Sequence, residues 1–283
     1  MLGKLMKYDL RSSFRRFGPL WLALLVLAVI NGFSMRGLFE AAASRGGFAR
    51  LFFTVLPPMA FFGVAVATAV LLIVFICERF YKGLLGDEGY LMFTLPTSVS
   101  AHIGAKTLSS LILWVLSTVV AFASGLLLLI VYQPGALAEG WRELCRALAE
   151  TQLPGAVVWL GLEALVLSLV SLVAEILKIY ASIALGHLAR RHRAFWSVMS
   201  YLGISLLMNF AMGFGLTSSA ATRLLGRLND MEWVMAYAEG NWMLQGLGAA
   251  ACVGGAAILL ELLLGALYFF ITRLLLTKKL NLE

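Results

Sequence analysis

Four ionisable side chains lie inside long apolar runs of the sequence: Glu163, Glu175, Lys178 and Glu261. A charge that faces lipid is costly, so each of these residues is a candidate for a functional role. Glu175 and Lys178 are three residues apart and can pair on one face of a helix. Together with Ser168, Ser171 and Ser182 they share an arc of about 80°, at ~100° per residue. This stripe predicts either polar contacts between helices or the lining of a substrate path, and the spacing leaves both open.

The two other glutamates have different surroundings. Small residues share a narrow helix face with Glu261: Ala250, Gly254, Ala257 and Gly265. Such a face permits close helix packing, so we expect Glu261 to face a neighbouring helix or a second copy of the chain. Glu163 stands apart in its run. Acids of this kind serve as relays in ion-coupled secondary carriers, and the sequence keeps that class of protein as an alternative.

The elements that must position these residues are membrane-spanning helices. The chain has 283 residues, of which 61% are hydrophobic and 13% charged. A soluble fold would expose large apolar patches at this composition, which excludes a cytosolic enzyme, a nucleic-acid-binding domain and a disordered chain. Six apolar runs are long enough to span a bilayer. They cover 17–35, 51–77, 108–132, 156–185, 195–216 and 246–272. We therefore predict an all-α membrane protein that forms a single domain over 1–283.

The distribution of basic residues predicts the orientation of these spans. Six spans place both termini on the same side of the membrane. Of the 22 Lys and Arg residues, fourteen fall on that side, seven on the other, and Lys178 lies in the fourth span. The positive-inside rule then predicts that both termini are cytoplasmic. This distribution explains the net charge of +7 without nucleic acid as a partner.

Motifs for catalysis or metal binding are missing from the sequence. The three cysteines are far apart and have no CxxC spacing, the three histidines are scattered, and no HExxH occurs. Gly104-Ala105-Lys106-Thr107 differs from a nucleotide-binding P-loop because Ala105 precedes the lysine. We expect no catalytic residue, no metal site and no bound cofactor in this chain.

Residues 2–17 have the pattern of an amphipathic helix. Lys7 and Arg11 share a basic face with Lys4 and Arg15, and Leu2, Met6, Leu10, Phe14 and Phe17 fill another face. The pattern predicts a helix that lies in the membrane interface. Its basic face suits anionic lipid headgroups or a cytosolic partner, and the two roles are compatible.

The segment between the second and third runs, residues 78–107, is unusual for a connector. Asp87 and Glu88 lie between Gly86 and Gly89, which suits a turn or a helix start. An apolar stretch follows and ends at Pro96, after which Thr97 or Ser98 can cap a helix that enters the third span. A short helix, a break and a second helix suit an element that receives force from another protein, although helix capping alone also explains the two acids.

Three stretches of the sequence resemble a known family. They are GDEGYLMFTLP at 86–96, YASIALGHLARRHRAFWS at 180–197 and KYDLRSSFRRF at 7–17. In this order they are similar to ABC type-2 permeases, the membrane subunits of ATP-binding-cassette exporters, and above all to small permeases of Gram-positive bacteria. With six spans, the resemblance covers nearly the whole chain.

The resemblance implies a partner and a contact site. Residues 84–95 would act as a coupling helix in a groove of a separate cytosolic ATPase, which would bind ATP and magnesium. Seven residues would make this contact: Asp87, Glu88, Gly89, Leu91, Leu95, Lys7 and Arg11. The permease would form a homodimer or a heterodimer with a second permease, in the bacterial plasma membrane. Peptides, lipids and other amphiphiles are all compatible as substrates.

Overall fold

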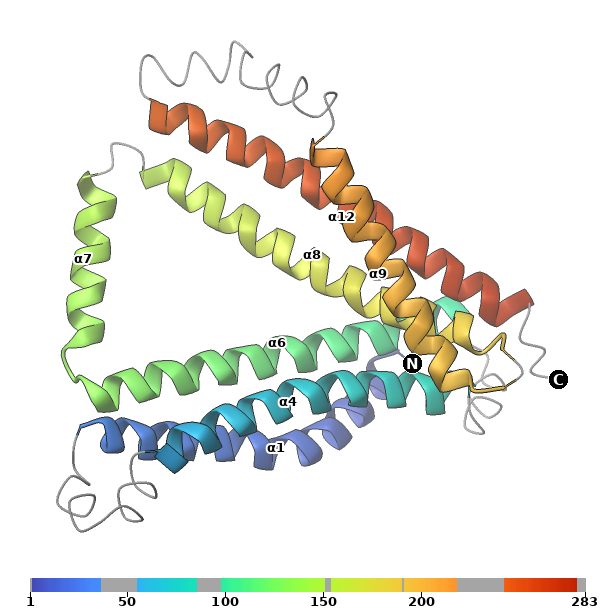
Figure 1. Ribbon diagram of the computed structural model, residues 1–283, viewed down its shortest axis with the longest axis horizontal. Coiled ribbons are helices and arrows are strands. Elements are labelled where there is room, and N and C mark those ends of the chain that lie inside the picture. The colour runs from blue at the N-terminus through green and yellow to red at the C-terminus, as the bar shows by residue number, and fades with distance from the viewer. Residues whose placement is uncertain are drawn as a thin grey trace. The chain divides into compact units, whose positions relative to one another are not determined.

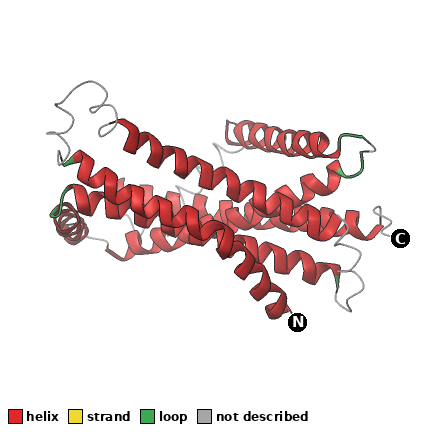
Figure 2. Cartoon of the chain, turned by 90° about the horizontal axis from the view of Figure 1, so that it is seen from below, coloured by secondary structure: helices red, strands yellow, loops and turns green. Residues whose placement is uncertain are grey.

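The computed structural model describes residues 2–36, 55–85, 98–150, 154–189, 191–217 and 242–278. Every regular element in these ranges is a helix (Figure 2). The α-helices are α1 (Leu2–Met35), α4 (Leu56–Phe80), α6 (Val99–Tyr132), α7 (Ala136–Glu150), α8 (Pro154–Gly186), α9 (Arg193–Thr217) and α12 (Trp242–Lys278), and a π-helical segment η2 (Tyr81–Leu85) follows α4. The all-α prediction is therefore confirmed for the described residues.

Six of these helices are long and apolar enough to cross a membrane. They are Leu10–Met35, Leu56–Gly83, Val99–Tyr132, Val158–Gly186, Arg193–Ala211 and Ala251–Thr277. Each overlaps one of the predicted runs, so the chain has the helices of a multi-pass membrane protein. Ser98 caps the third of them as predicted, because its Oγ accepts a hydrogen bond of 3.3 Å from the Ala101 amide.

Helix α1 differs from the prediction at its N-terminus. Residues 2–17 and the first span form one continuous helix that passes through Pro19, without a break between an interfacial part and a spanning part. Residues of the predicted apolar face also differ in burial. Phe17 is buried, whereas Phe14 is 45% exposed. The position of residues 2–17 in the membrane interface stays a prediction.

The chain forms two compact units, and the boundary falls inside α4 and α6. Unit 1 comprises 1–79 and 104–152, and unit 2 comprises 80–103 and 153–283. The prediction of a single domain is not tested by this division.

In unit 1, helices α1, α4 and α6 lie side by side (Figure 1). Trp21 of α1 donates a hydrogen bond of 3.2 Å from its indole to Ser117 of α6, and Asn31 donates one of 3.0 Å to the Pro57 carbonyl of α4. A Cβ at Gly32 would lie 2.6 Å from Val131, so α1 and α6 approach closely there. These contacts make α1 antiparallel to α4 and parallel to α6, as three successive membrane crossings require.

Polar contacts gather where α1 meets the C-terminal end of α4. Arg79 donates a hydrogen bond of 2.8 Å to the Ser13 hydroxyl, and the buried Lys106 donates one of 3.1 Å to the Arg79 carbonyl. Arg16 lies 5.3 Å from the centroid of the Phe75 ring. The side of α1 that carries Ser13 and Phe17 is thus occupied by protein within unit 1.

In unit 2, the C-terminal half of α8 forms the core. Its residues from Ala174 to Ala184 are almost all buried, and α9 and α12 pack against it. Gly254 and Gly265 of α12 lie next to Glu163 and Ala174 of α8. The two residues of each pair are separated by the same number of positions along the chain, so α8 and α12 run parallel. The small-residue face of α12 therefore packs on α8.

Candidate functional site

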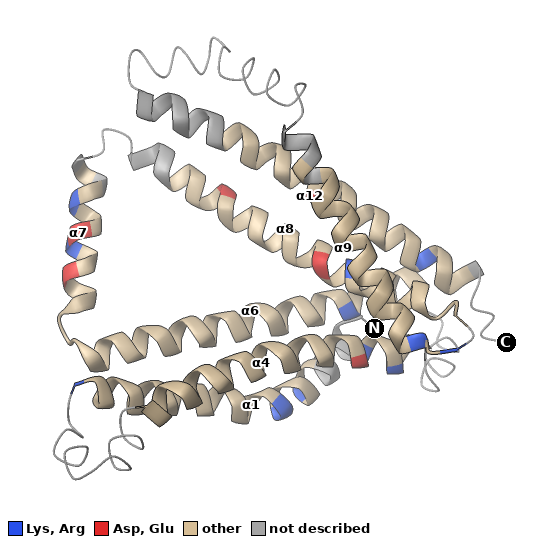
Figure 3. Ribbon diagram, viewed as in Figure 1, with Lys and Arg blue, Asp and Glu red and all other residues tan. Residues whose placement is uncertain are grey.

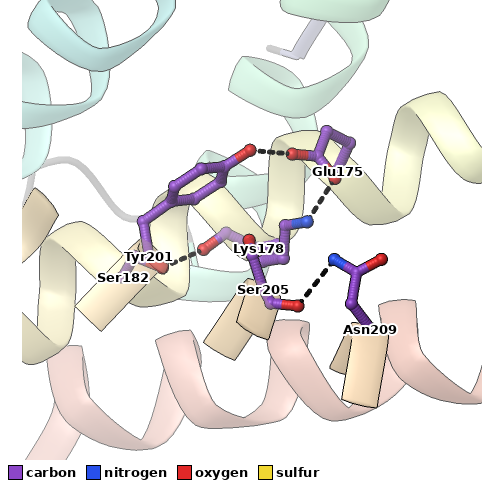
Figure 4. Close-up of polar contacts among 6 residues, drawn as sticks. All are labelled: Glu175, Lys178, Ser182, Tyr201, Ser205 and Asn209. Carbon is purple, nitrogen blue, oxygen red and sulfur yellow. Dashed lines mark hydrogen bonds and ion pairs between the residues drawn. The ribbon is translucent and has the colours of Figure 1, made fainter. Parts of the chain in front are cut away.

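A polar site lies between α8 and α9, inside segments that are otherwise apolar (Figure 4). The Glu175 carboxylate receives two charge-assisted contacts. Lys178 Nζ lies 2.6 Å from Glu175 Oε2, and the Tyr201 hydroxyl donates a hydrogen bond of 2.5 Å to Oε1. The Lys178 ammonium also lies 5.0 Å from the centroid of the Tyr201 ring. The three side chains therefore compensate one another across two helices.

The predicted pairing of Glu175 with Lys178 is confirmed, and the structure shows where the lysine points. The Lys178 side chain is only 15% exposed and turns to the glutamate, although a lysine near a span end can extend to the headgroups. One turn further along α8, the Ser182 hydroxyl donates to the Lys178 carbonyl at 2.8 Å. Whether this stripe joins helices or lines a path is not tested by these contacts.

Tyr201 is the residue that sequence reasoning missed. Polar residues recur every four positions along α9, at Ser197, Tyr201, Ser205 and Asn209. This spacing places them near one helix face. Ser197 packs against Gly186 of α8, and Asn209 donates to the Ser205 carbonyl at 2.8 Å (Figure 4). The regular spacing was the available signal for a polar face on α9 opposite the stripe on α8.

Helix α12 contributes two further polar groups to unit 2. These are Tyr268, which is buried, and Glu261. Because α8 and α12 are parallel, Glu261 lies at a depth between Glu163 and Glu175. Glu261 is partly exposed, and its role is not tested.

Glu163 lies against the glycines of α12. Its Oε1 would be 2.7 Å from a Cβ at Gly254 and 3.6 Å from one at Gly255. Its Oε2 is buried and has no hydrogen-bond partner in the described part of the chain. A buried polar atom without a hydrogen-bond partner is costly, so this oxygen is a candidate for binding a further group.

Few charged residues interrupt the spanning helices, which are mostly coloured tan in Figure 3, the colour of all residues other than Lys, Arg, Asp and Glu. The acids Glu163, Glu175 and Glu261 all belong to unit 2. Among the described residues, no group of three or more His, Cys, Asp or Glu side chains is arranged to hold a metal ion. The site offers carboxylates, one ammonium and phenols, which can hold helices together or bind a cationic group.

The turn between α8 and α9 brings a histidine and an arginine together. Arg193 donates a hydrogen bond of 3.3 Å to His187 Nε2, and the Tyr81 ring lies edge-on to the imidazole at 5.5 Å. Burial lowers the pKa of His187 below its usual value, and the Arg193 charge lowers it further. His192 has a positive φ of 54°, a left-handed conformation that turns the chain into α9.

The residues of the predicted ATPase contact lie mostly outside the described part of the chain. These are Asp87, Glu88, Gly89, Leu91 and Leu95. Lys7 belongs to α1, but its side chain is outside the description, and Arg11 is exposed on α1. Before the loop begins, the Phe80 ring at the end of α4 stacks on Tyr180 of α8 at 4.1 Å.

Comparison of the chain with protein families, curated proteins and solved structures found no match.

Proposed function

We propose that this chain is the permease subunit of an ATP-binding-cassette exporter. In this proposal it forms the translocation pathway in a bacterial plasma membrane, with both termini in the cytoplasm. It pairs with itself or with a second permease, and separate cytosolic ATPase subunits bind and hydrolyse ATP. Six membrane-length helices and the resemblance of three sequence stretches support this function.

The observation that carries the proposal is the anchoring of the segment that leads into residues 84–95. Phe80 and Tyr180 are both almost completely buried, and their rings stack at 4.1 Å. Tyr81 contacts His187 at the end of the same helix. A push on the loop would therefore be transmitted to α8, which forms the core of unit 2 and carries Glu175. A loosely attached connector would not transmit it.

Affinity purification of the full chain from its native membranes tests this function. We expect a P-loop ATPase to co-purify with the wild type and to be lost with Glu88→Arg. Glu139→Arg is the matched control, because it reverses a charge on exposed α7 and should leave the partner bound. If the ATPase still co-purifies with the Glu88→Arg variant, the exporter function would be supported but Glu88 would be excluded as a contact residue. A preparation without any ATPase after gentle solubilisation would contradict the proposal.

A second candidate function is an ion-coupled secondary carrier that uses Glu163, Glu175 and Glu261. The buried Glu163 Oε2, without a partner in the described ranges, favours it because such an oxygen suits proton or cation binding. A carrier would transport in proteoliposomes without ATP under a pH gradient, and Glu163→Gln would abolish that transport. Transport that requires ATP and persists in Glu163→Gln would exclude the carrier.

A further inference from the structure

One face of α1 changes from apolar to basic along the helix. Leu22 is 63% exposed, and towards the N-terminus the same face carries Gly18, Arg15 and Arg11, with Phe14 at its edge. At ~100° per residue these five residues fall within an arc of about 100°. Both arginines are exposed. The basic stripe of α1, Arg11 and Arg15, therefore continues into a face on which the apolar side chain of Leu22 is exposed.

Within unit 1, the other face of α1 makes the protein contacts. Ser13 accepts the hydrogen bond from Arg79, and Phe17 packs edge-on against Phe75 at 5.4 Å between ring centroids. An interfacial helix usually turns its apolar face to lipid and its basic face to water. In α1 the apolar face that includes Phe17 packs on α4, and among the described residues of unit 1 the basic stripe stays exposed.

The length of the helix sets the depth of these residues. The apolar part of α1, Leu10–Met35, has 26 residues. At ~1.5 Å per residue it is about 39 Å long, longer than the roughly 30 Å of a hydrocarbon core. Arg11 and Arg15 lie in its first two turns, where the headgroups begin. Leu22 lies two turns deeper, at the level of acyl chains.

The helix surface next to the arginines is open at Gly18. A Cβ built at Gly18 meets no atom within 4 Å, so the helix surface is open between Phe14 and Leu22. Glu78 lies 4.0 Å from Arg16, which points away from this face. Two guanidinium groups one turn apart can hold a phosphate with parallel hydrogen bonds.

We propose that Arg11 and Arg15 bind the phosphate of an anionic phospholipid, with an acyl chain along Gly18 and Leu22. The sequence alone left the basic stripe open to lipid or to a cytosolic partner. The exposed apolar continuation at Leu22 favours lipid, because a soluble protein does not reach that depth. Arg11 then binds lipid, and residues 84–95 make the proposed contact with the ATPase.

Native mass spectrometry of the full-length protein with phosphatidylglycerol or phosphatidylcholine tests the site. We expect Arg11→Gln/Arg15→Gln to weaken phosphatidylglycerol binding on the order of tenfold and to leave phosphatidylcholine binding unchanged. Arg142→Gln/Arg146→Gln is the matched control, with the same spacing on exposed α7. Equal binding to the first variant and the wild type would overturn the proposal. Retained lipid binding in this variant together with loss of a co-purified ATPase would also overturn the proposal, because the basic stripe would then bind the ATPase.

Gly18→Trp provides a second variant that keeps both charges. The open space at Gly18 makes normal folding the expected result, which the thermal unfolding midpoint checks. The indole should occupy the place of the acyl chain and reduce phosphatidylglycerol occupancy severalfold. Unchanged occupancy in a folded Gly18→Trp protein would contradict the proposed position of the lipid.

Discussion

The Tyr201 hydroxyl of α9 donates a hydrogen bond of 2.5 Å to Glu175 Oε1 of α8, while Lys178 holds the other oxygen of the same carboxylate. This relationship connects two helices that are both long enough to cross a membrane. The two partners together contact both oxygens of the Glu175 carboxylate. The interhelical role of the stripe on α8 can therefore be tested separately from any role in transport.

Removing the phenolic hydroxyl should loosen α9 from α8. We expect Tyr201→Phe to lower the free energy of unfolding by about 1 kcal/mol, the scale of an interhelical hydrogen bond within a membrane. Thermal unfolding in detergent measures this change. Tyr132→Phe, at the exposed end of α6, should have little effect. Equal stability of the wild type and Tyr201→Phe would show that the bond adds nothing to helix association.

Removing the ammonium should cost more than removing the hydroxyl. Lys178→Met leaves the Glu175 carboxylate without its cation, and we expect a loss of about 2 kcal/mol, reduced from the fully buried case because Glu175 is one-third exposed. The double variant Glu175→Gln/Lys178→Met should recover much of this loss. Chemical unfolding of the two variants measures the difference. Strictly additive losses would contradict the coupling of the pair.

A methyl group at Gly186 should separate α8 from α9. A Cβ there would lie 2.5 Å from the Ser197 Cα, and backbone atoms cannot move away without a shift of the helix. We expect Gly186→Ala to destabilise the protein by about 2 kcal/mol or more. Gly203→Ala on α9 is the control, since its Cβ would meet no atom within 4 Å. Similar unfolding midpoints for the two variants would refute the close contact.

His187 should make stability depend on pH. The folded state lowers the pKa of this imidazole, so its contribution is complete above the unfolded value of about 6.5 and is lost as pH falls towards the lowered value. Protonation also removes the lone pair on Nε2 that accepts from Arg193. Stability of the wild type should therefore fall as the pH drops below about 6.5.

Two substitutions separate this histidine from its neighbour in the turn. His187→Gln should flatten the fall in stability below about pH 6.5, as followed by thermal unfolding across this range. His192→Asn should keep the fall, because asparagine tolerates the left-handed conformation at that position. An unchanged pH profile in His187→Gln would assign the dependence to another group.

Apolar runs and residue spacing were sufficient to predict the six helices, the Ser98 cap and the pairing of Glu175 with Lys178. These features depend on hydropathy or on contacts within one helix, whose geometry is the same wherever the helix lies. Sequence reasoning could therefore place the ionisable side chains of α8 relative to one another before any packing was known.

The contacts between helices required the tertiary structure. Tyr201 as the partner of Glu175, Gly254 opposite Glu163, and Phe17 buried while Phe14 is exposed all depend on how each helix is rotated against its neighbours. In a membrane, lipid solvates an apolar face as well as another helix does, so hydropathy does not show which face turns inward. Close approach at small residues and pairing of polar groups decide that rotation, and both depend on two helices at once.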